Sequence, residues 1–197
     1  MPAGHQRSEQ VPFNFVRIHF LGYRAMKRCN RIRMQRVYDQ AEGYLELGMP
    51  RHALDVLARL SGRPDVTPYA FYLRGSAFLT LGQFQEALES LQRSAELAPE
   101  NGDVWLAMGC CYKRTGQLTS AISSLRHAAA VEPNRPIVHY NLACYLSLAG
   151  DKRGALAHLA RALDLEPSLG GLARKELDFG SLRSDPYFQA LISLVLR

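Results

Sequence analysis

Apolar residues along most of this chain recur at the three- and four-residue spacing of amphipathic helices, and the helical pattern itself repeats every 34 residues. Glycines punctuate the pattern at Gly48, Gly82, Gly116 and Gly150. The same 34-residue step joins Tyr44, Phe78, Tyr112 and Leu146 before the glycines, and Leu57, Leu91, Leu125 and Leu159 after them. Two amphipathic segments around a glycine, repeated four times, predict an all-α fold of four helix–turn–helix units.

The unit boundaries follow from glycine and proline, which end helices. Pro99, Pro133 and Pro167 close the last three units. The predicted units are 34–67, 68–101, 102–135 and 136–169. Each unit has room for two helices of about 12 to 14 residues. Stacks of this kind need at least three units to bury enough apolar surface, so four suffice.

Small residues mark the places where the two helices of a unit must approach closely. Gly109 on the first helix of the third unit is expected to face Ala121 on the second, and every unit has Gly or Ala at both positions. The turn glycines can adopt the left-handed conformation that ends a helix. Larger residues are predicted to fill the wedge between neighbouring units, at Val37, Phe71, Trp105 and His139.

The third unit resembles the tetratricopeptide repeat, a 34-residue motif with the pattern W-x2-L-G-x2-Y, then A-x3-F, then P. The resemblance rests on Trp105, Met108, Gly109, Tyr112, Gly116, Ala121, Leu125, Ala128 and Pro133. It implies a right-handed α-solenoid whose first helices line a concave groove. It also implies a scaffold that binds other proteins and is not an enzyme.

Beyond Pro167 the 34-residue period ends, and a separate C-terminal cap is predicted over 170–197. Ser184, Asp185 and Pro186 are typical of a helix start. The apolar residues that follow share one helical face, Phe188, Leu191, Ile192 and Val195. This helix is expected to cover the open end of the stack. The stretch 179–191 also resembles the tail that closes some bacterial repeat groups.

Positive charge is concentrated at the N-terminus. Residues 1–36 contain eight Lys or Arg and one acid, Glu9, a net charge of +7, whereas 37–197 carry 16 basic and 17 acidic residues. We expect 1–33 to form a basic arm, disordered at its start, whose apolar face caps the first repeat. Aromatic residues among the arginines leave nucleic-acid binding as an alternative, although no nucleic-acid-binding fold accompanies them. A chain starting at Met26 is expected to fold equally well.

The sequence favours a cytoplasmic protein. It has no uncharged apolar run of the roughly 18 to 20 residues that span a bilayer, and its N-terminus lacks a secretory signal pattern. The basic arm also resembles a mitochondrial presequence, which ranks below a cytoplasmic location. The four cysteines lack metal-binding spacing and are expected to be reduced thiols.

Apparent catalytic motifs occur without the other motifs that the same chemistry requires. The tripeptide at Asp178 spells the DFG of protein kinases, yet no phosphate-binding loop or catalytic loop accompanies it. The six histidines show no helical zinc-site spacing. We therefore predict no catalytic residue, no metal and no cofactor.

One stripe of the first helices remains for partner binding. Counting Gly102 as position one of a repeat, positions 2, 5, 9 and 12 share a stripe beside the one that packs on the second helix. We call this set the first-helix stripe. Its predicted groove residues, with Arg114 beside them, are Tyr38, Glu42, Leu45, Tyr72, Ser76, Leu79, Leu106, Cys110, Lys113, Arg114, Tyr140 and Cys144. Alternatively, the tyrosines only fill gaps between adjacent first helices.

The composition of the stripe predicts its ligand. Tyrosines offer large contact area and a polar tip, which suits an extended or helical peptide with apolar anchors. Tyr38 and Glu42 stand where chaperone-tail-binding repeats carry Lys and Asn, so that ligand is not expected. The sequence predicts a monomeric protein-interaction scaffold. The alternatives are a secretion-type chaperone with the same repeats or a nucleic-acid-associated protein acting through the basic arm.

Overall fold

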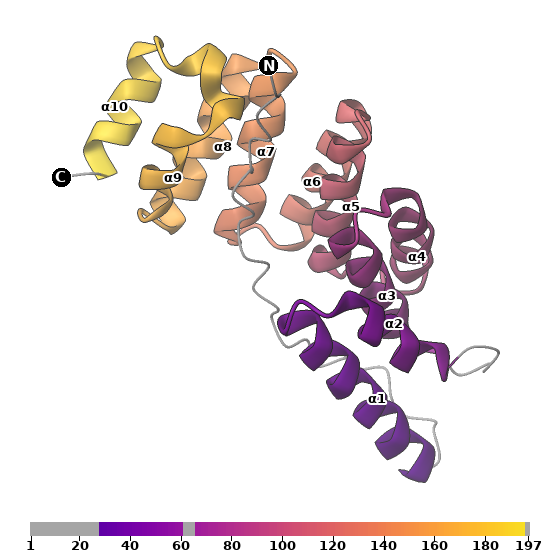
Figure 1. The fold of residues 1–197 in the computed structure, drawn as a ribbon. Helices are drawn as coiled ribbons and strands as arrows, with labels where there is room; N and C mark the ends of the chain where they lie inside the picture. The colour runs from indigo at the N-terminus through magenta and orange to yellow at the C-terminus, as the bar shows by residue number, and fades with distance from the viewer. Residues whose placement is uncertain (1–27, 61–65, 196–197) are drawn as a thin grey trace, which may run out of the picture.

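The computed structural model describes residues 28–60 and 66–195, and in this part it contains helices and no strand. Eight α-helices form four consecutive pairs, drawn in Figure 1: α1 (Arg28–Glu46), α2 (Pro50–Ala58), α3 (Pro68–Thr80), α4 (Phe84–Leu97), α5 (Gly102–Arg114), α6 (Leu118–Val131), α7 (Pro136–Leu148) and α8 (Lys152–Leu165). The C-terminal segment adds α9 (Leu169–Lys175), the 3₁₀ helix η1 (Leu177–Leu182) and α10 (Pro186–Val195). The predicted all-α solenoid of helix pairs is confirmed.

The turn inside each pair is made by the predicted glycine. Gly48, Gly82, Gly116 and Gly150 have φ values of 69°, 76°, 77° and 82°, and no other described residue has a positive φ. This left-handed conformation is disfavoured for residues with a Cβ atom. After Gly116, the amide of Gln117 donates to the carbonyl of Tyr112 at 2.8 Å and closes the helix end. The prediction for these glycines is confirmed.

Small residues hold the two helices of a pair together. A Cβ atom on Gly75 would lie 2.6 Å from Cγ of Leu91, and one on Gly109 would lie 3.0 Å from Cγ of Leu125. The alanines that face them from α4 and α6, Ala87 and Ala121, are fully buried. The second helix of each pair therefore packs almost directly on the backbone of the first.

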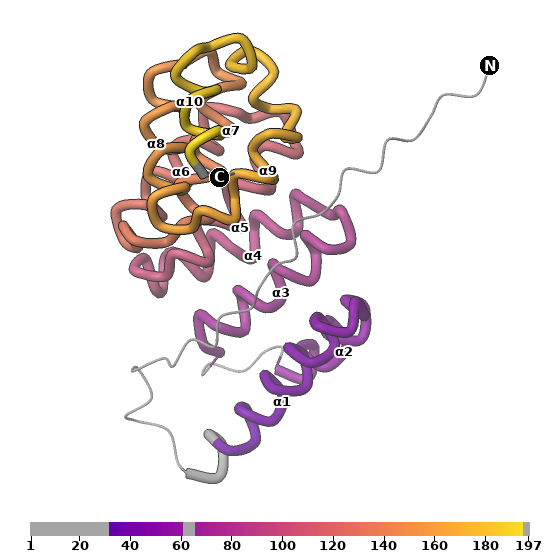
Figure 2. Tube along the Cα trace, turned by 90° about the vertical axis from the view of Figure 1, so that its left-hand side faces the viewer, coloured from indigo at the N-terminus to yellow at the C-terminus, as the bar shows by residue number. Residues whose placement is uncertain are grey.

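The first helices form the inner layer of the stack. Each second helix contacts the first helix of the next pair, and α1 contacts α3 as α3 contacts α5, whereas α5 and α7 approach each other less closely. In the described part, no comparably close contact joins second helices of neighbouring pairs. A stack whose first helices lie closer together than its second helices curves with the first helices on the inside. Figure 2 shows the resulting progression from α1 and α2 at one end to α9 and α10 at the other.

The first pair differs in length from the prediction. Helix α1 begins at Arg28, ahead of the expected boundary at residue 34, and runs for 19 residues. No Pro or Gly stands between Gly22 and Gly43, so nothing in the sequence ends a helix there. Helix α2 has only 9 residues, whereas α3 to α8 have the expected 13 or 14. The arm preceding Arg28 lies outside the described residues.

The C-terminal segment is a degenerate fifth repeat that has lost its signature residues. Helix α10 begins at Pro186, 34 residues after Lys152, where α8 begins. The turn glycine and the small residue of this unit are replaced by Ser184 and Gln189, so the sequence pattern stopped one unit early. Asp185 caps α10 by accepting hydrogen bonds from two backbone amides at 2.9 and 3.2 Å.

The cap completes the second of two hydrophobic clusters. One cluster extends from Met34 to Cys111, and the other from Leu106 to Ile192. Trp105 and Tyr112 of α5 pack against both, so α5 joins the two halves of the solenoid. The prediction that a C-terminal helix covers the open end is confirmed by the burial of Phe188 and Ile192.

Candidate protein-binding surface

The structure places the predicted groove residues in register on α1, α3, α5 and α7, and most of them are buried. The buried members are Tyr38, Leu45, Tyr72, Ser76, Leu106, Tyr140 and Cys144. The members that retain exposed surface are Glu42, Leu79, Cys110, Lys113 and Arg114. The accessible part of the stripe therefore consists of one acid, one leucine, one thiol and two cations.

Tyrosine rings form a ladder between α1 and α3. Tyr38 meets Tyr69 edge to face at 5.5 Å between ring centroids, and Tyr69 stacks on Tyr72 at 6.1 Å. The Thr67 hydroxyl donates to the Tyr38 hydroxyl at 2.8 Å. The ladder fills the gap between neighbouring first helices and keeps the edge of Tyr69 partly exposed. Burial, with the Glu42 carboxylate nearby, raises the pKa of Tyr69, which therefore stays neutral.

The other end of the stripe holds a segment of the chain itself. Tyr140 of α7 meets Phe179 of η1 edge to face at 5.8 Å, and Phe179 is fully buried. The ammonium group of Lys113 forms an ion pair with the carboxylate of Asp178. Thus one aromatic ring and one carboxylate of η1 are recognised by a tyrosine and a lysine of the first helices.

Lys113 also connects this contact to the cysteines of the stripe. Its ammonium nitrogen lies 5.1 Å from the ring centroid of Tyr145, whose hydroxyl points to Sγ of Cys110 at 3.9 Å. Arg114 takes a different direction, with its guanidinium carbon 5.4 Å from the ring centroid of Phe84 at the start of α4. The two neighbouring cations, predicted at one side of the groove, therefore do not act together.

Two residues of the stripe were not singled out by the sequence analysis. Tyr69 and Asp103 occupy position 2 of the second and third repeats, so the 34-residue period contained the signal. Asp103 is buried and its carboxylate is 2.5 Å from a guanidinium nitrogen of Arg135, which also bonds Glu132 at 2.7 Å. Burial raises the pKa of Asp103, and Arg135 opposes that rise. This network fixes the link between the third and fourth repeats.

Three thiols on α5 and α7 are held in the protonated form by burial. Cys110, Cys111 and Cys144 are free, and burial raises the pKa of each, to about 12 for Cys111. Because the thiolate is the reactive form, these residues behave as small apolar side chains. Across 28–60 and 66–195, no group of three or more His, Cys, Asp or Glu could hold a metal ion. None of the helices in those ranges is long and apolar enough to span a membrane.

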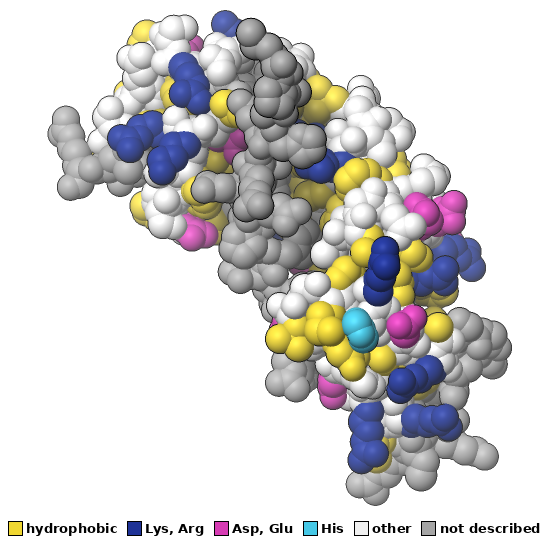
Figure 3. Space-filling model, viewed as in Figure 1, with side chains coloured by type: hydrophobic (Ala, Val, Ile, Leu, Met, Phe, Trp, Pro, Cys, Tyr) yellow, Lys and Arg dark blue, Asp and Glu magenta, His cyan; other side chains and the backbone are white. Residues whose placement is uncertain are grey.

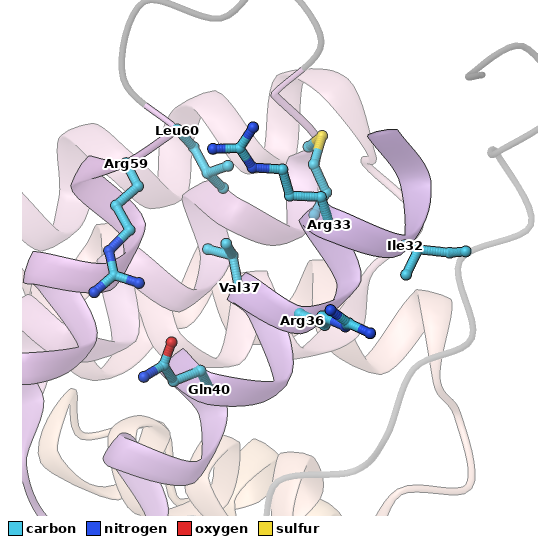
Figure 4. A pocket seen from close by; sticks show the side chains of 8 residues that line it. Ile32, Arg33, Arg36, Val37, Gln40, Arg59 and Leu60 are labelled. Atoms are coloured by element: carbon cyan, nitrogen blue, oxygen red, sulfur yellow. The ribbon is translucent and has the colours of Figure 1, made fainter. Parts of the chain in front are cut away.

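A pocket that the sequence analysis did not predict lies at the outer end of the first repeat. It has a volume of about 480 Å³ and is lined by Ile32, Arg33, Met34, Arg36, Val37, Gln40, Arg59 and Leu60. In Figure 4, Arg33 from α1 and Arg59 from the end of α2 reach to either side of Val37. The pocket therefore has an apolar floor and a rim of guanidinium groups.

Comparisons with known proteins agree with the repeat architecture. Two family profiles, both described as tetratricopeptide repeat, match residues 38–102 and 78–143 and together span more than half of the chain. No curated protein matches. YrrB, a solved structure described as a TPR protein with an unusual peptide-binding site, is 25% identical with a TM-score of 0.62. The similarity covers 71% of this chain and 73% of YrrB.

Two further structures share the fold at lower identity. TTC0263, a thermophilic TPR protein of Thermus thermophilus, is 24% identical with a TM-score of 0.62, covering 82% of this chain and 89% of TTC0263. MamA of AMB-1 is 22% identical with a TM-score of 0.66, covering 83% of this chain and 92% of MamA. With its four helix pairs, its left-handed turn glycines and these two profile matches, the chain belongs to the tetratricopeptide repeat family.

Proposed function

We propose that this protein is an interaction scaffold that binds a peptide segment of a partner protein, extended or helical, along the first-helix stripe. The observation that supports this most is the contact with η1. There a short 3₁₀ segment lies against α7 with a ring on Tyr140 and a carboxylate on Lys113. The same kind of surface continues toward α1, where the described residues of the cap do not reach.

The accessible members of the stripe define the contacts of such a peptide. Leu79 on α3 and Cys110 on α5 offer apolar surface, and Glu42 on α1 offers a carboxylate. The tyrosine ladder between α1 and α3 is rigid because its rings pack on each other. Rigid aromatic surfaces bind at low entropic cost, so an apolar anchor over Leu79 with a basic or amide group near Glu42 fits best.

The comparison with YrrB supports a peptide as the ligand. YrrB is described as having an unusual peptide-binding site and is 25% identical to this chain over the aligned residues. Tetratricopeptide repeat proteins are typically non-catalytic scaffolds, in agreement with the raised pKa values of the stripe thiols Cys110 and Cys144. Peptide recognition along the inner layer is therefore the function we assign.

A charge placed on the stripe tests the proposal. Peptides selected from a display library with the wild-type protein are measured against Leu79→Glu. The matched control is Leu97→Glu, on a leucine that is 53% exposed on α4, a second helix. Loss of an apolar interface anchor costs about 2 kcal/mol, so the affinity of Leu79→Glu should fall roughly thirtyfold.

Leu97→Glu should bind like the wild type, and thermal melting by circular dichroism should show both variants folded. Equal binding by Leu79→Glu and the wild type would contradict the proposal. Equal loss in both variants would also contradict it, since binding would then not depend on the inner layer.

A further inference from the structure

The outer end of the first repeat has a small side chain at a position that a large ring occupies in the third repeat. In the third repeat, Trp105 fills the wedge toward the preceding unit, and its indole N–H donates to the carbonyl of Pro99 at 2.7 Å. Val37 holds the equivalent position in the first repeat. The pocket of about 480 Å³ lies there, with Val37 and the buried Met34 and Leu60 in its wall. Among the described residues, this wedge is therefore left as a pocket.

The cations around this pocket have no acidic partner within the described residues. Arg33, Arg36 and Arg59 form no ion pair there, and Asp55, four residues before Arg59, does not bond it. Further along the solenoid, Arg93, Arg135 and Arg161 each hold a carboxylate at 2.5 to 2.9 Å. Figure 3 shows Lys and Arg side chains gathered at the α1 end of the molecule. Like charges therefore converge on one apolar pocket.

We propose that this pocket is a second docking site, separate from the first-helix stripe, for an acidic segment of a partner protein with an apolar anchor. The apolar side chain enters the pocket onto Val37 and Leu60. Carboxylates on either side of it in the partner accept hydrogen bonds from Arg33 and Arg59. Guanidinium groups form paired bonds to carboxylates, and partial burial beside an apolar floor strengthens such bonds relative to open water.

Charge argues against two other occupants. The chain's own residues 1–27 carry Arg7, Arg17, Arg24 and Lys27 against Glu9, so they lack the carboxylates to pair with the rim. A second copy stacking end to end would present its cap, and residues 170–197 carry four basic and three acidic residues. Neither segment supplies the excess of carboxylates that three arginines require.

The apolar floor argues against a nucleic-acid backbone. Phosphates are neutralised by basic side chains on an open surface and need no apolar anchor beside them. An acidic peptide with a leucine uses both features of the pocket. Dependence of binding on that leucine therefore separates the two classes of partner.

The experiment uses a fluorescent peptide of glutamates and aspartates around two central leucines, with fluorescence anisotropy against the full chain. A second peptide carries serines in place of the leucines. The double variant Arg33→Glu, Arg59→Glu should bind the leucine peptide at least about tenfold more weakly than the wild type. Its matched control is Arg153→Glu, Arg174→Glu, the same charge change at exposed sites on α8 and α9, which should lose less than about threefold.

Further readouts decide between the occupants. The serine peptide should bind several-fold more weakly than the leucine peptide, and light scattering should show a monomer with and without peptide. Equal binding of the two peptides overturns the proposal. So does a competition experiment in which oligouridine RNA displaces the labelled leucine peptide at a lower concentration than the unlabelled leucine peptide does. So does a loss in the control pair equal to that in the pocket pair, or a dimer that disappears in Arg33→Glu, Arg59→Glu.

The two proposed sites can be tested independently of each other. The pocket variant should keep its affinity for peptides selected on the first-helix stripe, and Leu79→Glu should keep its affinity for the acidic peptide. Thermal melting of Arg33→Glu, Arg59→Glu should match the wild type within a few degrees, because both side chains are exposed.

Discussion

The two ends of the solenoid differ in how the apolar surface of the last helix pair is covered. At the C-terminal end, α10 packs on α8 and α9, and Leu182, Phe188 and Ile192 are buried. At the N-terminal end of the described chain, Ile32 is 49% exposed and a pocket with a charged rim remains open. Solenoid ends need a polar outer cover. The C-terminal end is covered by a degenerate repeat, whereas the N-terminal end is formed by a long helix that carries several arginines.

This difference suggests different roles for the two ends: the covered end stabilises the fold, and the open end is available to bind a partner. A covered end contributes buried apolar area and should make the last repeats the most stable part of the chain. An open end contributes little area but leaves side chains available for a partner. Three predictions test this contrast between the ends.

The largest effect is expected from removing the cap. Deleting 184–197 removes α10 with the buried Phe188 and Ile192 and uncovers Leu159 and Leu163 of α8. Burial of two large apolar side chains is worth several kcal/mol, so the melting temperature should fall by about 10 °C or more, with a loss of solubility.

The matched change at the other end is a chain that starts at Met26. Its melting temperature should equal that of the full chain. If the shortened C-terminus leaves a monomer with unchanged melting, the cap is dispensable. A marked loss in the chain starting at Met26 would instead assign residues 1–25 to the core.

Single side chains at the two ends should show the same contrast with smaller effects. Phe179 is fully buried between Tyr140 and Phe188, so Phe179→Ala should cost about 3 to 5 kcal/mol in the free energy of unfolding. Val37 at the open end is only partly buried, and Val37→Ala should cost about 1 kcal/mol or less. Urea unfolding measures both, and similar costs would remove the distinction between covered and open ends.

The smallest effect concerns a histidine pair in the last repeat. Nε2 of His139 lies 2.9 Å from the carbonyl of Pro133, which can only accept, so this nitrogen carries the proton. Nδ1 of His139 then accepts from Nδ1 of His158 at 3.0 Å. The first repeat has Val37 and Val56 at these two positions. A titratable contact thus replaces an apolar one.

The pair should make the C-terminal half sensitive to acid. Burial lowers the pKa of His158, and His139 of α7 and Arg126 of α6 lower it further, against the opposing effect of Asp151. The unfolded chain then binds more protons than the folded one, so the contribution is present above the unfolded pKa of about 6.5 and is lost as pH falls below it.

Replacing both histidines tests this directly. Between pH 7.5 and 5.5, the melting temperature of the wild type should fall a few degrees more than that of His139→Val, His158→Val, which copies the first repeat. The same pH dependence in both proteins would show that the pair does not control it. Single His127→Val serves as the control, since it removes a histidine of α6 whose ring centroid lies 4.0 Å from that of Trp105 and which is not part of the pair.

The contrast between the ends was only partly visible in the sequence. The helical cap was predicted from Asp185 and Pro186 and the apolar residues after them, because capping and amphipathic spacing are local properties. That this cap is a fifth unit was not predicted, because Ser184 and Gln189 stand where the earlier repeats have the small residues that define the period. The pocket at the open end was not predicted either. Its lining comes from two helices together, and Arg59 could have been bonded to Asp55.

The sequence by itself determined the number of complete repeats, the turn glycines and the register of the first-helix stripe. These features depend on spacing, because the left-handed turn at Gly116 strongly favours glycine and the close approach at Gly109 admits only small residues, such as Ala41 and Ala143 in other repeats. Only the tertiary structure decided which stripe residues are accessible. Tyr140 and Leu79 belong to the same stripe, yet Tyr140 is covered by Phe179 from a segment 39 positions along the chain, while Leu79 stays partly exposed. Exposure depends on what packs against a residue from elsewhere, and a local pattern contains no information about that partner.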